Sequence, residues 1–253
     1  MSRWGLRRSV LLATLGVVSL GFAGAAVGCT GSGGVRMFNE APLAEGWPEL
    51  TPVGEVQVKE YPQTRAAVVR DDVPEVDAEG EQAESDAAGD QPVKSRAERR
   101  REMDGAFMKL FNHIKKNDIA MTSPVDMGYA EIEADEVDAD AVPEQVSMAF
   151  LYRRTDQGEA GEDGEVLVQD LPARTYVSIG VRGGYTDERF VKNLAALDAW
   201  LEENTDVWQP DGPPRYLGYN SPFVPPFMRY GEVQRPVRPV GVEVEGEALP
   251  STE

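Results

Sequence analysis

A short segment of this sequence occurs twice, 110 residues apart, and this repeat constrains the fold more than any other feature. Glu55–Pro62 (EVQVKEYP) and Glu165–Pro172 (EVLVQDLP) have four identical positions. After each proline, apolar and polar residues mix over 64–70 and over 174–182, as in half-buried strands. The sequence therefore predicts two copies of a hairpin, each made of a strand, a proline turn and a second strand.

Each predicted hairpin is followed by a predicted helix. The first helix is expected over 97–116, with an apolar face made of Phe107, Leu110, Phe111 and Ile114. The second is expected to begin at Thr186 or Asp187, either of which can cap it, and to end near Asn204. Its apolar face consists of Phe190, Leu194, Leu197 and Leu201. The repeated unit therefore extends from the hairpin into a helix.

A Ser-Pro pair between apolar residues follows each helix, in Met121–Val125 (MTSPV) and in Tyr219–Phe223 (YNSPF). We interpret the two pairs as equivalent points of the repeat, because proline stops a helix and suits a strand end. The remaining strands are expected at 125–132, 146–153, 214–220 and 230–237. Two hairpin–helix–strand units predict one α+β domain, with a curved, barrel-like antiparallel sheet, two helices and a groove near a pseudo-twofold axis.

The first 28 residues are typical of a signal peptide, with three early arginines before an apolar run. Cys29, the only cysteine, follows small residues, and a Gly-rich stretch comes after it. This pattern favours lipidation of Cys29 and a tether over 29–52, which would place an exported protein at the cell envelope. Ordinary cleavage, giving a soluble secreted or periplasmic protein, and an uncleaved anchor are the alternatives.

Acidic residues give the chain a net charge of −19 and gather in distinct runs. Residues 71–90 hold nine acids without Lys or Arg, which indicates a solvated acidic insert over 71–95. Residues 131–144 form a second acidic run, and 241–253 form an acidic tail. Because phosphate contacts need a basic face, we do not expect nucleic acid as a partner.

Two blocks of the sequence resemble the SOUL/haem-binding-protein family. One is Phe107–Ile114 followed by Ile119–Val125 (IAMTSPV), and the other is Tyr219–Val233 (YNSPFVPPFMRYGEV). The resemblance covers about 53–237 and defines a SOUL-type domain over 53–240. It implies a pseudo-symmetric curved sheet with two helices, related to the effector-binding domains of bacterial regulators. It also implies that haem or another tetrapyrrole binds at a hydrophobic surface cleft beside the first helix, often without an essential axial ligand.

His113, the only histidine, is the candidate axial ligand to haem iron. It stands where the family commonly has Tyr, and the chain has no histidine upstream, where the family's ligating histidine lies in members that have one. At about 100° per residue, His113 falls at the edge of the apolar helix face. The alternative interpretation is therefore a partly solvated boundary residue.

The candidate ligand-binding residues lie on the first helix and in a Pro-rich loop near the C-terminus: Phe107, Leu110, Phe111, His113, Ile114, Phe223, Phe227 and Met228. Each helix residue alone also suits the core. The loop holds so much apolar surface that a cover or a ligand is expected.

Catalytic patterns do not emerge from the sequence. One histidine and one cysteine outside the domain cannot build a zinc triad, and GxSxG, P-loop and Rossmann motifs are absent. We therefore expect a non-enzymatic, membrane-tethered module that binds haem or another flat apolar ligand. The alternatives are an envelope lipoprotein that has lost its ligand and contacts proteins through its acidic inserts, and a small carboxylate-dependent hydrolase on the same fold.

Overall fold

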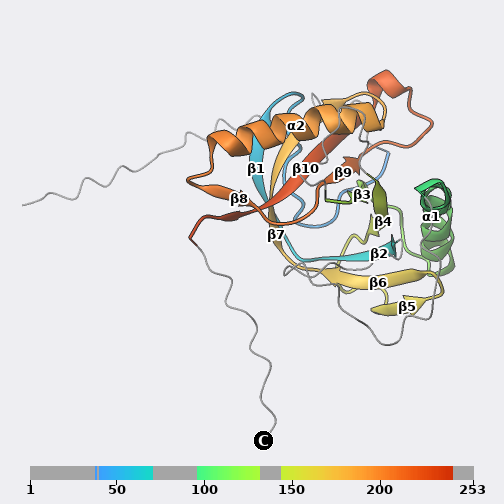
Figure 1. Cartoon of the computed structure of the whole chain (residues 1–253). Coiled ribbons are helices and arrows are strands. Elements are labelled where there is room, and N and C mark those ends of the chain that lie inside the picture. Colours follow the sequence, from blue (N-terminus) through green and yellow to red (C-terminus); the bar gives the residue numbers. More distant parts are fainter. Residues whose placement is uncertain (1–37, 39, 71–95, 132–143, 242–253) are drawn as a thin grey trace, which may run out of the picture. The chain divides into compact units, whose positions relative to one another are not determined.

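The computed structural model describes the domain and leaves several predicted segments outside it (Figure 1). The described residues are 38, 40–70, 96–131 and 144–241. The chain divides into two units, 1–31 and 32–253, and all described residues belong to the second. The predicted signal peptide, the lipidation site Cys29, the acidic insert and most of the acidic tail lie outside the described residues. Among the helices described, none has the length and apolar character needed to cross a membrane.

Within the described residues, the domain contains ten strands, two α-helices and one 3-10 turn. In chain order these are β1 (Val56–Tyr61), β2 (Thr64–Arg70), α1 (Arg96–Lys116), β3 (Val125–Tyr129), β4 (Gln145–Leu151), β5 (Gly161–Asp163), β6 (Val166–Leu171), β7 (Arg174–Arg182), α2 (Asp187–Glu203), β8 (Trp208–Pro210), β9 (Arg215–Gly218), η1 (Pro226–Met228) and β10 (Tyr230–Pro239). The predicted elements are all present, and two short strands, β5 and β8, were not predicted.

The sheet has the pseudo-twofold symmetry that the sequence repeat predicts. All its pairs are antiparallel, and its strand order is β1-β7-β10-β9-β3-β4-β2-β6-β5, with β8 added beside β10. The strands of the two halves correspond in pairs: β1 with β6, β7 with β2, β10 with β4 and β9 with β3. Corresponding strands stand at equal distances from the two ends of the order β1-β7-β10-β9-β3-β4-β2-β6. The pseudo-axis therefore passes between β3 and β9, which confirms the duplicated α+β architecture.

The two strands before each helix do not form the hairpins that the sequence predicted. Instead β1 pairs with β7 and β6 pairs with β2, so each first strand joins the opposite half of the sheet. The physical reason lies in Pro62 and Pro172, which open the two-residue links. The favoured two-residue hairpin turns need a positive φ at their first residue, and proline fixes φ near −65°.

These short links also determine how strongly the sheet curves. β1 and β2 stand six places apart in the strand order, yet only Pro62 and Gln63 separate them along the chain. In a flat sheet six strand spacings amount to about 29 Å. The three Cα–Cα steps from Tyr61 to Thr64 span at most about 11 Å. The sheet therefore curves until its ends approach each other, although it remains open and does not close into a barrel (Figure 1).

Each helix covers its own half of the sheet. α2 packs on β7 and β10, and all four residues of its predicted apolar face are buried: Phe190, Leu194, Leu197 and Leu201. The backbone N–H of Arg189 donates to the Thr186 side chain at 3.4 Å, which confirms the predicted N-cap. α1 packs on β4, β2 and β6. The predicted helices therefore close both halves of the core.

The two Ser-Pro pairs are not structurally equivalent, contrary to our expectation. Ser123 and Pro124 directly precede β3, whereas Ser221 and Pro222 follow β9 in the β9–β10 loop. The strand correspondence above makes β9 the counterpart of β3, and the residues directly before β9 are Pro213 and Pro214. In both halves a proline thus stands just before the strand. At this position the residue does not have to donate a backbone hydrogen bond to the neighbouring strand.

Candidate functional site

The predicted site residues on α1 divide between the core and the surface. Leu110 and Ile114 are buried in the core cluster beneath the helix. Phe107 is half-buried and meets the ring of Phe150 edge to face, with ring centroids 5.1 Å apart. Phe111 lies on the outer surface, 39% exposed. A surface ligand would therefore meet only the outer edge of the predicted helix face.

His113 is buried, which contradicts the interpretation of a partly solvated boundary residue. Its Nε2 lies 2.8 Å from the Tyr152 hydroxyl and its Nδ1 lies 2.9 Å from Oδ2 of Asp163. Because a carboxylate only accepts, Nδ1 donates to Asp163, and Nε2 forms the second hydrogen bond of the ring with the Tyr152 hydroxyl. Both ring nitrogens thus have partners. To bind iron through Nε2, His113 would have to break its hydrogen bond with Tyr152.

A polar network continues from His113 to the surface. The carboxylate of Asp163 also accepts from Lys116 at 2.8 Å. Hydrogen bonds from Lys116, then from His113 and Asn117, lower the pKa of Asp163 to about 2. Burial raises the pKa of Tyr152 to about 12. The network borders an open cavity of about 470 Å³. The Tyr152 hydroxyl stays protonated at neutral pH, and the Asp163 carboxylate already accepts hydrogen bonds from Lys116 and His113.

The other predicted site residues lie in the β9–β10 loop, which presents aromatic side chains to solvent. Phe223 is 94% exposed and Phe227 is 68% exposed, whereas Met228 is half-buried. The guanidinium of Arg229 holds the loop by donating to the carbonyls of Val224 at 2.8 Å and Pro222 at 2.7 Å. The exposed rings therefore belong to a loop with internal hydrogen bonds.

The loop leaves the sheet close to the cluster that α1 covers. Gly218, the last residue of β9, lies opposite Val125 of β3. Val125 packs against the core cluster that contains Leu110 and Ile114. Figure 1 shows η1 beside α2, and the N–H of Gly183, just before that helix, donates to the carbonyl of Arg229 at 2.9 Å. Neither Phe223 nor Phe227 lines the cavity beside His113, so no cavity brings the two groups of predicted site residues together among the described residues.

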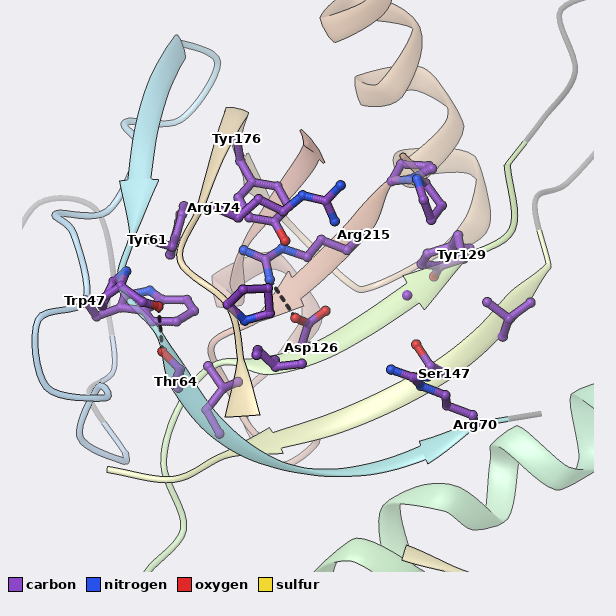
Figure 2. Close-up of a pocket in the computed structure, with 18 residues that line it drawn as sticks. Trp47, Tyr61, Thr64, Arg70, Asp126, Tyr129, Ser147, Arg174, Tyr176 and Arg215 are labelled. Atoms are coloured by element: carbon purple, nitrogen blue, oxygen red, sulfur yellow. Dashed lines mark hydrogen bonds and ion pairs between the residues drawn. The ribbon is translucent and has the colours of Figure 1, made fainter. Parts of the chain in front are cut away.

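A second cavity, of about 250 Å³, lies where the two halves of the sheet meet (Figure 2). Pro62 and Pro172, the matching ends of the repeated motif, both line it, as do Asp126 of β3 and Arg215 of β9. This is the groove that the duplication predicted near the pseudo-axis. We call it the central cavity. The sequence repeat indicated its position, but no motif indicated the charged residues that line it.

Arg215 is held in the wall of the central cavity by three kinds of contact. Its Nη1 donates to Oδ2 of Asp126 at 2.8 Å and its Nε donates to Gln234 at 2.9 Å. The guanidinium lies 3.7 Å from the ring centroid of Tyr176. Burial disfavours the charge, but the Asp126 carboxylate and the tyrosine hydroxyls outweigh burial and raise the pKa of Arg215. Arg215 therefore stays charged.

A buried carboxylate, Glu232, organises the core beyond this cavity. It is fully buried and accepts from Lys59 at 3.1 Å, from Tyr230 at 2.8 Å and from the backbone of Thr51 at 2.8 Å. Burial lowers the pKa of Lys59, although the neighbouring carboxylate opposes this shift. With so many donors around it, Glu232 is not placed to act as a general base.

The described residues offer little for metal or carboxylate chemistry. No group of three His, Cys, Asp or Glu side chains among them could hold a metal ion. Asp126 is the only carboxylate that lines the central cavity, and it is paired with Arg215. The pair of facing carboxylates expected of a carboxylate-dependent hydrolase is therefore not found at this cavity.

Solved structures share this fold at low sequence identity. EcmrR in complex with DNA matches with a TM-score of 0.50 and 16% identity, over 73% of this chain and 57% of EcmrR. This chain thus spans little more than half of that protein. An uncharacterised conserved protein from Listeria innocua matches with a TM-score of 0.48 and 12% identity, over 74% of this chain and 94% of that one. A hydrolase from Listeria innocua matches with a TM-score of 0.45 and 11% identity, again over 74% and 94%.

The likeness to EcmrR agrees with the curved antiparallel sheet and two helices that the sequence resemblance implied. The chain matches no curated protein in sequence. The family model described as SOUL heme-binding protein matches residues 54–236, which include both helices and both halves of the sheet. This chain belongs to the SOUL heme-binding protein family.

Proposed function

We propose that this protein binds haem, or another flat apolar tetrapyrrole, through the exposed apolar side chains of the β9–β10 loop and of α1. The family is a ligand-binding family associated with haem, which supports this ligand class. We further propose that the module is exported and held at the cell envelope by a lipid on Cys29, where it stores, scavenges or delivers its ligand.

The observation that carries the proposal is the exposure of Phe223 and Phe227 on a loop with internal hydrogen bonds. Phenyl rings in water gain about 25 cal/mol for each Å² that a ligand covers. A flat macrocycle can cover such rings, and Phe111 and Met108 on α1 are further exposed apolar side chains. Binding of this kind depends on apolar contact and does not need an axial ligand.

The contact of Phe38 with the β9–β10 loop supports placing this loop near a membrane. The side chain of Asn220, at the root of the loop, donates to the carbonyl of Phe38 at 2.9 Å. Eight residues lie between Cys29 and Phe38, and the nine Cα–Cα steps that join them span at most about 32 Å. A lipid on Cys29 would therefore keep the aromatic loop within reach of the membrane surface.

The test is a titration of the mature chain with haemin, followed by its Soret absorption. We expect a saturable Soret shift at micromolar protein. We also expect the double variant Phe223→Ala, Phe227→Ala to bind at least about tenfold more weakly, because a fully buried Phe contributes about 1.5–3 kcal/mol. The control is a double variant that removes two exposed apolar side chains elsewhere, Val207→Ala and Val240→Ala.

Two results would contradict the proposal. One is a titration without a saturable Soret shift. The other is equal haemin affinity for the wild type and the phenylalanine double variant. Mass spectrometry of the protein purified from membranes tests the second part, because lipidation of Cys29 predicts an N-terminal acyl mass that a Cys29→Ser variant loses.

Of the two alternatives that the sequence left open, the structure bears only on the hydrolase. A carboxylate-dependent hydrolase needs two facing carboxylates, and the central cavity offers only Asp126 in its ion pair. The protein-interaction alternative relies on the acidic insert 71–95, which lies outside the described residues. Partners captured by the whole chain but lost on deletion of 71–95 would favour that alternative.

A further inference from the structure

The central cavity holds a cationic group that its surroundings only partly satisfy. Arg215 is nine-tenths buried, and its Nη2 is buried without a hydrogen-bond partner among the described residues. Its other two nitrogens are engaged by Asp126 and Gln234. Buried polar groups without a partner are rare in folded proteins, and each one requires an explanation. A missing acceptor at Arg215 is the simplest explanation here.

The charges around the cavity favour an anion as that acceptor. Three arginines line it, Arg70, Arg174 and Arg215, against a single carboxylate, Asp126. Asp126 neutralises Arg215, and Asp211 pairs with Arg174 at 3.0 Å from outside the cavity. Arg70 has no ion-pair partner within the described residues. Counted over the described residues, the cavity therefore has one positive charge in excess, in a chain whose net charge is −19.

The walls of the cavity favour an aromatic ligand but disfavour a cation. Trp47, Tyr61 and Tyr176 line one side, and Figure 2 shows Tyr61 and Tyr176 beside Arg215. The guanidinium lies 3.7 Å from the Tyr176 centroid and 5.1 Å from the Tyr61 centroid. The protein's own cation thus occupies the place where an organic cation would stack on these rings.

The cavity also limits the size of the ligand. Its volume of about 250 Å³ lies below the roughly 300–1,000 Å³ typical of drug-sized ligands, so it cannot enclose a tetrapyrrole. Gly128 contributes to the space, because a Cβ there would lie 2.3 Å from Oγ of Ser147, which also lines the cavity. A side chain at position 128 would displace that hydroxyl.

We propose that the central cavity is a second binding site, for a small planar aromatic carboxylate. The carboxylate pairs with Arg215 and Arg70, and the ring lies against Trp47, because the guanidinium already covers the tyrosines. This site is separate from the surface on which we place the tetrapyrrole, because neither Phe223 nor Phe227 lines it. Either proposal can therefore fail while the other stands.

Ligands that differ only in charge test this site in the mature chain. The probes are benzoate, 1-naphthoate and indole-3-carboxylate, each beside its neutral carboxamide and its cationic amidine. Calorimetry at constant ionic strength measures binding, since salt screens exposed charges. We expect at least one carboxylate to bind, and to bind at least tenfold more tightly than its amide and its amidine. If no carboxylate binds, or if an amidine binds as tightly as its carboxylate, the proposal is wrong.

Variants place the binding at the cavity. Arg70→Gln, which removes an exposed arginine, should weaken carboxylate binding severalfold without changing the melting temperature. Arg215→Gln should abolish binding if it folds, and Gly128→Ala tests the cavity space independently. Arg154→Gln, an exposed arginine outside this cavity, is the matched control and should bind as the wild type does. Unchanged carboxylate binding in both Arg70→Gln and Gly128→Ala would overturn the assignment.

Discussion

Arg215 and Asp126 form an ion pair across the pseudo-twofold axis, with Nη1 and Oδ2 2.8 Å apart. Arg215 belongs to β9 in the second half of the sheet, and Asp126 belongs to β3 in the first. Each side chain is only 11% exposed. The pair therefore joins the two copies of the repeat where their central strands meet.

Removal of Asp126 should destabilise the fold strongly. In Asp126→Leu, Arg215 remains charged and buried without its carboxylate, which costs about 3–5 kcal/mol of unfolding free energy. The double variant Asp126→Leu, Arg215→Met should recover much of that loss, because apolar groups can replace a buried ion pair. Urea unfolding measures both. Asp156→Ala, which removes an exposed partner of Arg154, is the control and should unfold like the wild type.

Two glycine substitutions should change stability in opposite directions. A Cβ at Gly180 of β7 would lie 2.3 Å from the backbone oxygen of Thr51, so Gly180→Ala should cost about 1–3 kcal/mol through overpacking. A Cβ at Gly105 of α1 meets nothing within 4 Å, so Gly105→Ala should stabilise the helix by about 0.5–1 kcal/mol. Thermal and urea unfolding of the two variants test this. Similar effects of the same sign would contradict it.

Replacement of His113 should separate its structural role from iron ligation. In His113→Ala the Tyr152 hydroxyl loses its partner in the core, which should cost about 1–3 kcal/mol of unfolding free energy. Because both ring nitrogens already have partners, we expect the Soret maximum of the haemin complex to stay in place. Absorption spectroscopy under conditions where the variant is folded is the measurement. A shifted Soret band would instead identify His113 as the axial ligand.

The Asp163 network predicts a dependence of stability on acid pH. The pKa of Asp163 is lowered from 3.8 to about 2 in the folded protein, first by Lys116 and then by His113. A lowered carboxyl pKa stabilises the fold fully above the unfolded pKa, and this contribution is lost as the pH falls from about 3.8 through about 2. The stability difference between the wild type and Asp163→Asn should therefore shrink over that range.

Urea unfolding at a series of pH values measures this difference. Glu162→Gln, on the same strand, is the control and should keep the wild-type pH profile. Added salt should weaken the Asp163 contribution, since Lys116 is exposed. A difference between the wild type and Asp163→Asn that stays constant down to pH 2 would contradict the prediction.

Pro62 shows that part of the strand pairing was already present in the sequence. The repeat predicted a hairpin around this proline, and the structure pairs the two strands with opposite halves instead. A proline at the first position of a two-residue link is incompatible with the favoured hairpin turns. The sequence thus indicated that a hairpin was unfavourable, but it did not indicate which strand each partner would join.

The helices show what can be predicted from local pattern and what cannot. The buried face of α2 was predicted in full, because an amphipathic helix with an N-cap such as Thr186 is determined by residues close in the chain. On α1, Phe111 belongs to the same apolar pattern as Leu110 and yet is exposed. Only the extent of the underlying sheet determines where that face ends.

The sequence by itself determined the duplicated α+β architecture, both helices and the family, since these depend on local periodicity and on motifs that are continuous in the chain. Tertiary structure alone decided that Arg215 meets Asp126, 89 residues away, and that His113 meets Tyr152 and Asp163, 39 and 50 residues away. Strand register brings such partners together, and their charges and hydroxyls carry no local pattern. The lining of the central cavity therefore became visible only once the two halves were packed.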